Sequence, residues 1–168
     1  RNFVPTMVPM LATRGEFLTS YTPYQPEVSQ GMLQAMWEIQ TMVSELVGLP
    51  ISNVSSHDAS TSAAEAITCA VRVKSKKASQ PSAVYISDLV PPHRLSVIEN
   101  YTQGVGIELH QLPHNEDGTL DLGAASSASG SCAVYVEQPN ALGLLDEGLM
   151  GIREAIGATT ALIVGVDA

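Results

Sequence analysis

The chain has 168 residues, which is enough for one hydrophobic core. It is 45% hydrophobic and only 15% charged, a composition that excludes an intrinsically disordered chain and is typical of a globular protein. Its formal net charge of −9 argues against binding to nucleic acid, because the phosphate groups would be repelled.

The first part of the chain, residues 1–28, is expected to be irregular and to form a segment of its own. Four prolines deny it a long helix: Pro5, Pro9, Pro23 and Pro26. From residue 29 to residue 47, apolar side chains recur every three to four positions, which predicts an amphipathic helix that ends at Gly48.

The rest of the chain alternates between predicted helices and strands. Helices are predicted over residues 61–73, 91–103 and 146–156, and one helical turn near residues 120–125 in a polar loop over 114–130. Strands are predicted over residues 83–87, 105–112, 132–136 and 161–166. This alternation predicts that residues 29–168 form an α/β domain with a mostly parallel sheet and helices on both faces. Ligands of such sheets bind at the carboxyl ends of the strands.

The two cysteines, Cys69 and Cys132, lie far apart on predicted core elements and do not have the spacing of zinc ligands. We therefore expect buried free thiols in a reducing compartment, the cytoplasm, and no metal site. No apolar run is long enough for a membrane span, so we expect no membrane partner. The chain starts without Met and stops after an apolar run typical of a central strand, which predicts that it is a fragment of a longer protein.

Polar side chains are crowded between two prolines just before the first long helix. The prolines stiffen the backbone, which lowers the entropy cost of holding polar groups ready for a ligand. An ordinary surface loop, with Glu27 near the positive N-terminus of the helix, explains the pattern about as well. The candidate binding residues of this loop are Tyr21, Thr22, Tyr24, Gln25 and Glu27.

Hydroxyl groups gather before the predicted helix over residues 61–73. The free N–H groups of a helix N-terminus, together with Ser60 and Thr61, would suit a phosphate or carboxylate. Simple helix capping, for example by Ser62 with Glu65, is the favoured alternative.

Neither the histidines nor the lysines point to catalysis by this chain alone. No metal-site spacing links the four histidines: His57, His93, His110 and His114. A lysine that forms a Schiff base should be isolated and desolvated near a strand end. The only lysines are instead clustered at the polar end of one predicted helix: Lys74, Lys76 and Lys77.

The run from Glu16 to Gly31, EFLTSYTPYQPEVSQG, closely resembles the signature of subunit 1 of glycine dehydrogenase (decarboxylating), the P-protein family of the glycine cleavage system. The similarity covers nearly the whole chain. It continues through residues 40–43, 45–49, Asp58, Thr61 and 64–66, and more weakly through 136–140 and Gly143.

This resemblance implies a truncated large domain of a fold type I enzyme dependent on pyridoxal 5′-phosphate (PLP). It also implies that subunit 1 pairs in a heterotetramer with subunit 2, which carries the PLP lysine. The complete enzyme, an oxidoreductase, removes the carboxyl group of glycine as carbon dioxide. It then passes the aminomethyl group to the lipoyl arm of H-protein. By this resemblance the chain alone is expected to be inactive.

By the same resemblance, the loop from Tyr21 to Glu27 lies at the subunit interface near the active site. Its tyrosine hydroxyls and Gln25 would orient glycine or the PLP phosphate, whereas Glu27 would do the same or anchor the loop. Ser60 and Thr61 would be a vestigial phosphate-binding turn, in which Ala59 stands where glycine is expected. Asp167 falls near the position of the residue that binds the pyridinium nitrogen in catalytic relatives.

Two alternatives stay open at the level of sequence. The chain could belong to a fused or self-sufficient fold type I enzyme whose lysine follows Ala168. It could also be a scaffold subunit with no role in the active site.

Overall fold

The structure is a computed structural model that describes residues 3–18, 22–54, 56–74 and 82–166. It has two compact units, residues 1–55 and 56–168. The division predicted at residue 28 falls inside the first unit and stays a prediction. None of the helices in the described ranges is long and apolar enough to cross a membrane.

The first unit is helical. Its elements are α1 (Met7–Ala12), α2 (Gly15–Leu18), the 3-10 helix η1 (Pro26–Val28) and α3 (Gln30–Val47). The predicted amphipathic helix is thus confirmed as α3, and Gly48 ends it in the left-handed conformation with φ 67°. The segment before it holds short helices where we predicted irregular chain. Pro9 is tolerated in the first turn of α1, where its missing N–H would have had no helical partner.

The second unit has the predicted α/β fold, whereas the bounds predicted for that domain, residues 29–168, stay a prediction. Its long helices are α4 (Ala59–Lys74) and α5 (Pro92–Gln103), and its shorter ones are α6 (Leu122–Ala125), η2 (Ser126–Ala128), η3 (Glu147–Gly151) and α7 (Ile152–Ile156). Its strands are β1 (Ser82–Ser87), β2 (Ile107–Leu112), β3 (Ala133–Gln138) and β4 (Ala161–Val166). They form one parallel sheet in the order β2-β1-β3-β4.

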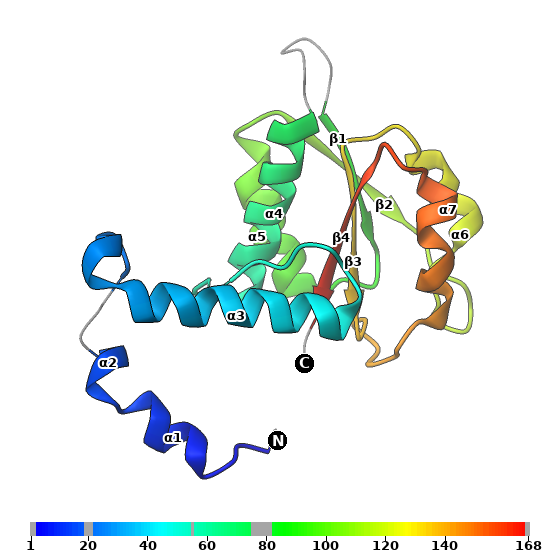
Figure 1. Cartoon of the computed structure of the whole chain (residues 1–168). Coiled ribbons are helices and arrows are strands. Elements are labelled where there is room, and N and C mark those ends of the chain that lie inside the picture. Colours follow the sequence, from blue (N-terminus) through cyan, green and yellow to red (C-terminus); the bar gives the residue numbers. More distant parts are fainter. Residues whose placement is uncertain (1–2, 19–21, 55, 75–81, 167–168) are drawn as a thin grey trace. The chain divides into compact units, whose positions relative to one another are not determined.

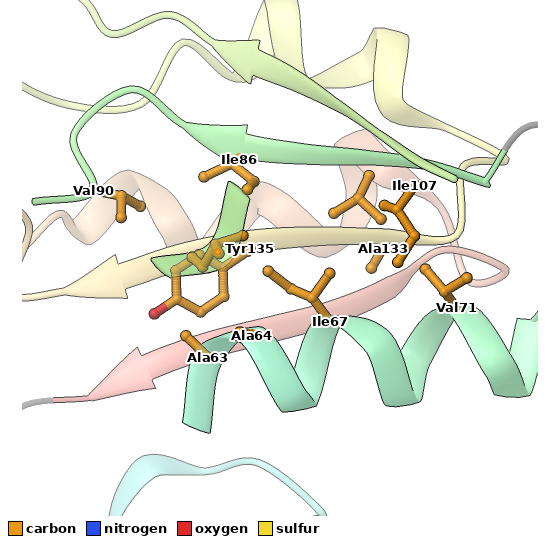
Figure 2. Close-up of a cluster of buried hydrophobic side chains, with 11 residues drawn as sticks. Ala63, Ala64, Ile67, Val71, Ile86, Val90, Ile107, Ala133 and Tyr135 are labelled. Atoms are coloured by element: carbon orange, nitrogen blue, oxygen red, sulfur yellow. The ribbon is translucent and has the colours of Figure 1, made fainter. Parts of the chain in front are cut away.

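Helices cover both faces of this sheet (Figure 1). On one face, Ile67 and Val71 of α4 pack with Ile98 of α5 and with sheet residues that include Tyr135, a cluster drawn in Figure 2. On the other face, α6, η2 and α7 pack against residues of alternate orientation, among them Val134 and Val136. The prediction of a parallel sheet with helices on both faces is therefore confirmed.

Strand β3 joins the two cores. Five of its six residues, from Ala133 to Glu137, are buried. Because side chains alternate along a strand, Ala133 and Tyr135 enter one cluster and Val134 and Val136 the other. The near-continuous apolar pattern of a doubly covered parallel strand thus explains the sequence of β3.

Two expectations were wrong in detail. Cys69 is exposed, because it lies on the side of α4 away from Ile67 and Val71, whereas Cys132 is partly buried. The helix predicted over residues 146–156 is divided into η3 and α7. Asp146 lies outside it as the N-cap, with its side chain accepting a hydrogen bond from the N–H of Gly148.

Gly165 provides a stringent test of packing at the end of β4. A Cβ atom at this position would lie 2.5 Å from the hydroxyl oxygen of Tyr135 and 3.2 Å from Cγ of Glu137. We expect Gly165→Ala to destabilise the protein by about 1–3 kcal/mol through overpacking. Chemical denaturation should show this loss.

The control is Gly104→Ala, because Gly104 has a right-handed backbone conformation and open space around its Cα. Equal free energies of unfolding for the two variants would contradict the packing described for Tyr135.

Candidate functional site

The loop before α3 presents its polar side chains to solvent. Residues 22–28 are described, whereas Tyr21 lies outside the described residues. The N–H of Tyr24 donates to the carbonyl of Thr22 at 2.9 Å, and the N–H of Val28 donates to the carbonyl of Gln25 at 3.2 Å. Tyr24 is 88% exposed, and no residue of the described ranges hydrogen-bonds to its hydroxyl or to the Glu27 carboxylate. The turn is therefore fixed by backbone hydrogen bonds, while the side chains of Tyr24 and Glu27 are exposed.

A hollow of about 460 Å³ lies where this loop enters α3. Its walls come from η1 and from one side of the helix: Pro26, Glu27, Gln30, Leu33, Gln34 and Trp37. The structure thus brings Glu27 of the predicted loop together with Trp37, a residue that sequence analysis did not select. Helical spacing of Leu33 and Trp37 four positions apart was the signal available for it.

The N-terminus of α4 is occupied by a carboxylate of the chain itself. Oδ1 of Asp58 accepts a hydrogen bond from the N–H of Thr61 at 2.8 Å, and Oδ2 accepts one from its hydroxyl at 2.6 Å. These bonds lower the pKa of Asp58, first through the hydroxyl and then through the N–H of Thr61. The favoured prediction of capping is thus met by Asp58, a residue that sequence analysis had not assigned as the cap.

These residues do not fit the phosphate of a PLP cofactor. The donors of Thr61 already bind Asp58, whose negative charge would repel a phosphate group. Lys74 is the last residue of α4, and the other two lysines lie outside the described residues. The assignment of Ser60 and Thr61 as a vestige of such a site stays a prediction.

A buried ion pair lies at the carboxyl end of β3. Nη1 of Arg94, from the first turn of α5, is 2.7 Å from Oε1 of Glu137. The hydroxyl of Tyr135 donates to the same oxygen at 2.8 Å. The side chain of Glu137 is only 5% exposed, and Nε of Arg94 is buried without a partner among the described residues. A charged pair of this kind needs both members, since either alone would be a buried charge.

The pKa values agree with this arrangement. Burial by itself would lower the pKa of the Arg94 guanidinium, but its hydrogen bond to Glu137 and the charge of that carboxylate raise it. Burial, followed by the charge of Glu137, raises the pKa of the Tyr135 hydroxyl. Tyr135 therefore stays protonated near neutral pH and donates to the carboxylate.

Two further sets of polar contacts connect the loops at the carboxyl ends of the strands. Oδ2 of Asp88, just after β1, lies 2.9 Å from Nδ1 of His114, just after β2. Asp146 is buried and accepts from the N–H of Leu120 at 2.8 Å, while its backbone exchanges two hydrogen bonds of 2.9 Å with the amide of Gln138. Asp88 and His114 come just after predicted strands, and Asp146 starts a predicted helix; these positions were the available sequence signals, but the partners come from distant segments.

The other predicted positions bring no site together. His57, His93 and His110 are exposed, and His110 lies against the ring of Tyr85 with centroids 4.9 Å apart. Asp167 lies outside the described residues. In the described ranges, no group of three or more histidine, cysteine or acidic side chains is arranged to hold a metal ion.

Two solved structures of low sequence identity define the class of fold. The cysteine desulfurase of Thermococcus onnurineus NA1 superposes with a TM-score of 0.55 and 20% identity, over 82% of this chain and 34% of that one. The sphingosine-1-phosphate lyase of Burkholderia pseudomallei K96243 superposes with a TM-score of 0.58 and 13% identity, over 86% and 35%. The chain thus shares its α/β fold with part of each of these two enzymes.

Sequence comparison shows the family. Residues 2–167 match the family described as glycine cleavage system P-protein. The chain belongs to this family. A relative from Thermococcus onnurineus, named "probable glycine dehydrogenase (decarboxylating) subunit 1", is 43% identical over 99% of this chain and 36% of its own length. A protein of the same name from Desulfotalea psychrophila is 35% identical over 97% and 35%.

A solved structure agrees with membership of the P-protein family. The crystal structure of glycine decarboxylase (P-protein) of the glycine cleavage system, in inhibitor-bound form, superposes with a TM-score of 0.78 and 42% identity. It is matched over 98% of this chain and 36% of that one. The chain therefore spans little more than a third of the length of the relatives it matches.

The Arg94–Glu137 pair predicts a large loss of stability when the cation is removed. Arg94→Met leaves the Glu137 carboxylate buried with only the Tyr135 hydroxyl, so we expect the free energy of unfolding to fall by about 3 kcal/mol. Denaturant titration should show this loss. The control, Arg72→Met, removes an exposed arginine from the last turn of α4 and should change stability by less than about 0.5 kcal/mol. Similar values for both variants would contradict the buried pair.

Asp58 predicts a pH-dependent contribution of the α4 cap. Its folded-state pKa is lowered from 3.8, so the charged cap stabilises the fold above that pH, and the contribution disappears as pH falls through the folded-state value. Asp58→Asn keeps a hydrogen-bond acceptor but loses the charge. We expect this variant to be less stable than the wild type at pH 7 and to approach it at strongly acidic pH. A deficit that is constant across denaturation midpoints from pH 7 to acid would contradict this account.

Proposed function

We propose that this chain is part of subunit 1 of a glycine decarboxylase, the P-protein of a glycine cleavage system. The observation that carries the proposal is the match to the P-protein family over residues 2–167, together with a TM-score of 0.78 to a solved P-protein. In the proposed complex, the complete enzyme decarboxylates glycine and transfers the aminomethyl group to the lipoyl arm of H-protein.

The proposed cofactor is PLP, bound to a lysine of subunit 2. Two features of this chain support a cofactor held elsewhere. Its three lysines all lie between residues 74 and 77, and the donors of Thr61 are already bound by Asp58. When bound, PLP supplies the electron sink for the reaction, and the surrounding protein supplies orientation and electrostatics.

The contribution proposed for this chain is the loop before α3. Thr22, Tyr24 and Gln25 lie in a turn fixed by backbone hydrogen bonds and have exposed side chains. Such groups are suited to orient glycine or the cofactor phosphate across a subunit interface, because little entropy is lost when they bind. Tyr21 belongs to the same proposal on the basis of the sequence signature alone. We place the assembly, a heterotetramer, in the cytoplasm.

Reconstitution of the natural full-length chain with its subunit 2 tests this function. Exchange of labelled bicarbonate into glycine should be absent with either chain alone and should appear when the two are mixed. Tyr24→Phe should lower the kcat/KM of the mixture about tenfold if its hydroxyl contacts the reacting groups. The matched control is Tyr101→Phe, at an exposed tyrosine of α5.

Two results would contradict the proposal in different ways. Exchange by the full-length chain alone would favour a self-sufficient enzyme. Unchanged turnover and glycine affinity in Tyr24→Phe would leave the loop with a role in assembly only.

A further inference from the structure

We propose that Asp117–Gly118 is a site of isoaspartate formation in this chain and that Thr119 keeps the rate low in the folded state. Isoaspartate formation is a spontaneous covalent change of the backbone, and it occurs most readily where aspartate or asparagine precedes glycine. Asp117–Gly118 is the only such dipeptide among the 168 residues. The inference goes beyond the proposed function and does not depend on it, because every reacting group belongs to this chain.

The reaction takes place between these two neighbouring residues. The backbone nitrogen of Gly118 bonds to Cγ of Asp117, the bond from Cγ to the hydroxyl of the protonated carboxyl group breaks, and a water molecule leaves. The cyclic imide that results then takes up a water molecule. Hydrolysis at the side-chain carbonyl restores aspartate, whereas hydrolysis at the main-chain carbonyl gives isoaspartate, in which the main chain runs through Cγ. The reaction needs no oxidant and no cofactor.

The fold requires glycine at position 118. Its φ of 81° is a left-handed conformation that other residues rarely adopt, and a Cβ atom would lie 2.8 Å from Cδ1 of Leu144 and 2.9 Å from Cδ1 of Leu142. The carbonyl of Gly118 also accepts a hydrogen bond from Nδ2 of Asn140 at 2.9 Å. Packing therefore fixes glycine here, although a bulkier side chain would slow attack by the backbone nitrogen.

Thr119 holds the carboxylate of Asp117 in place. Oδ1 of Asp117 accepts a hydrogen bond from the hydroxyl of Thr119 at 2.7 Å and another from its N–H at 3.0 Å. These bonds, first the one from the hydroxyl, lower the pKa of Asp117, so the protonated form that can lose water is less populated. They also restrict the side-chain rotation that the reaction needs.

The attacking nitrogen is held as well. The N–H of Gly118 donates to the carbonyl of Asn115 at 2.9 Å, and the N–H of Asn115 donates to the carbonyl of Thr119 at 2.8 Å. Nδ2 of Asn115 donates to the hydroxyl oxygen of Thr119 at 3.0 Å. Isoaspartate formation therefore requires this turn to open locally, and its rate in the folded chain depends on how often the turn opens.

Isoaspartate here would disturb the contacts between two loops. The turn is joined to the loop after β3 by the hydrogen bond of Asn140 to Gly118 and by that of the N–H of Leu120 to Oδ2 of Asp146. The longer main chain of isoaspartate would shift Gly118 and Leu120 relative to these partners. Because Asp146 is buried, the loss of a hydrogen bond to its carboxylate destabilises the fold.

The test incubates the natural full-length chain at neutral pH, either folded or unfolded in guanidinium chloride, and measures isoaspartate by enzymatic methylation and peptide mapping. In the unfolded chain we expect most isoaspartate at Asp117, and in the folded chain formation there at least about tenfold slower. Thr119→Val should raise the rate in the folded chain about tenfold, because it removes a hydrogen bond to a charged group. Thr119→Ser keeps a hydroxyl and should react at the original rate.

The matched control is Thr68→Val, which removes a hydroxyl that bonds to the carbonyl of Glu65 in α4 and should leave the rate at Asp117 unchanged. Deamidation at Asn100, in α5, is measured in every variant to detect loss of the whole fold. Equal rates at Asp117 in the folded and unfolded chain would overturn the inference, as would equal rates in Thr119→Val and Thr68→Val. A parallel rise at Asn100 in Thr119→Val would assign the effect to global unfolding and overturn the role of Thr119.

Discussion

The double burial of β3 is the constraint on which the α/β unit depends. Its alternate side chains enter both hydrophobic clusters, so helices from both faces are fixed to one strand. The same alternation places Glu137 on the face of Tyr135, at a depth where a lone carboxylate would be very costly. Arg94 and the Tyr135 hydroxyl offset this cost, and the space they need excludes even one methyl group at Gly165. At the carboxyl end of β3, the close packing around Gly165 and the ion pair of Glu137 therefore depend on the same side chains.

The internal pairs at the carboxyl ends of the strands bear on where a ligand could bind. In open α/β sheets, ligands bind beyond the carboxyl ends of the strands. Here this edge is filled by internal pairs: Arg94 with Glu137, Asp88 with His114, and Asp146 with backbone groups of the neighbouring loops. The N-terminus of α4 is likewise closed by Asp58. These pairs thus stabilise the fold of the α/β unit, although Oδ1 of Asp88 and Nε of Arg94 are buried there without a partner among the described residues. The polar side chains of the loop before α3 are exposed instead.

Local sequence patterns were sufficient to predict the fold, but they did not predict which buried polar side chains pair with one another. Periodic apolar residues placed α3, and the alternation of short apolar runs with helices placed the parallel sheet, because burial on one or both faces determines these patterns. The signature around Tyr24 and Glu27 pointed to the loop that lines the hollow. The partners of Glu137 and Asp146 were not predictable, since Arg94 and Leu120 are 43 and 26 positions away and only the fold brings them close. Asp58 was missed as a cap because several hydroxyl residues beside it offered equally good local candidates.

The central claim is that this chain acts in trans, on a cofactor held by another subunit. Titration of PLP into the natural full-length chain, with and without subunit 2, tests it most directly. The account predicts that the visible absorption of a protein Schiff base appears only when subunit 2 is present, and that borohydride reduction attaches the cofactor to that subunit. Reduction that attaches PLP to the chain containing residues 1–168 would contradict it.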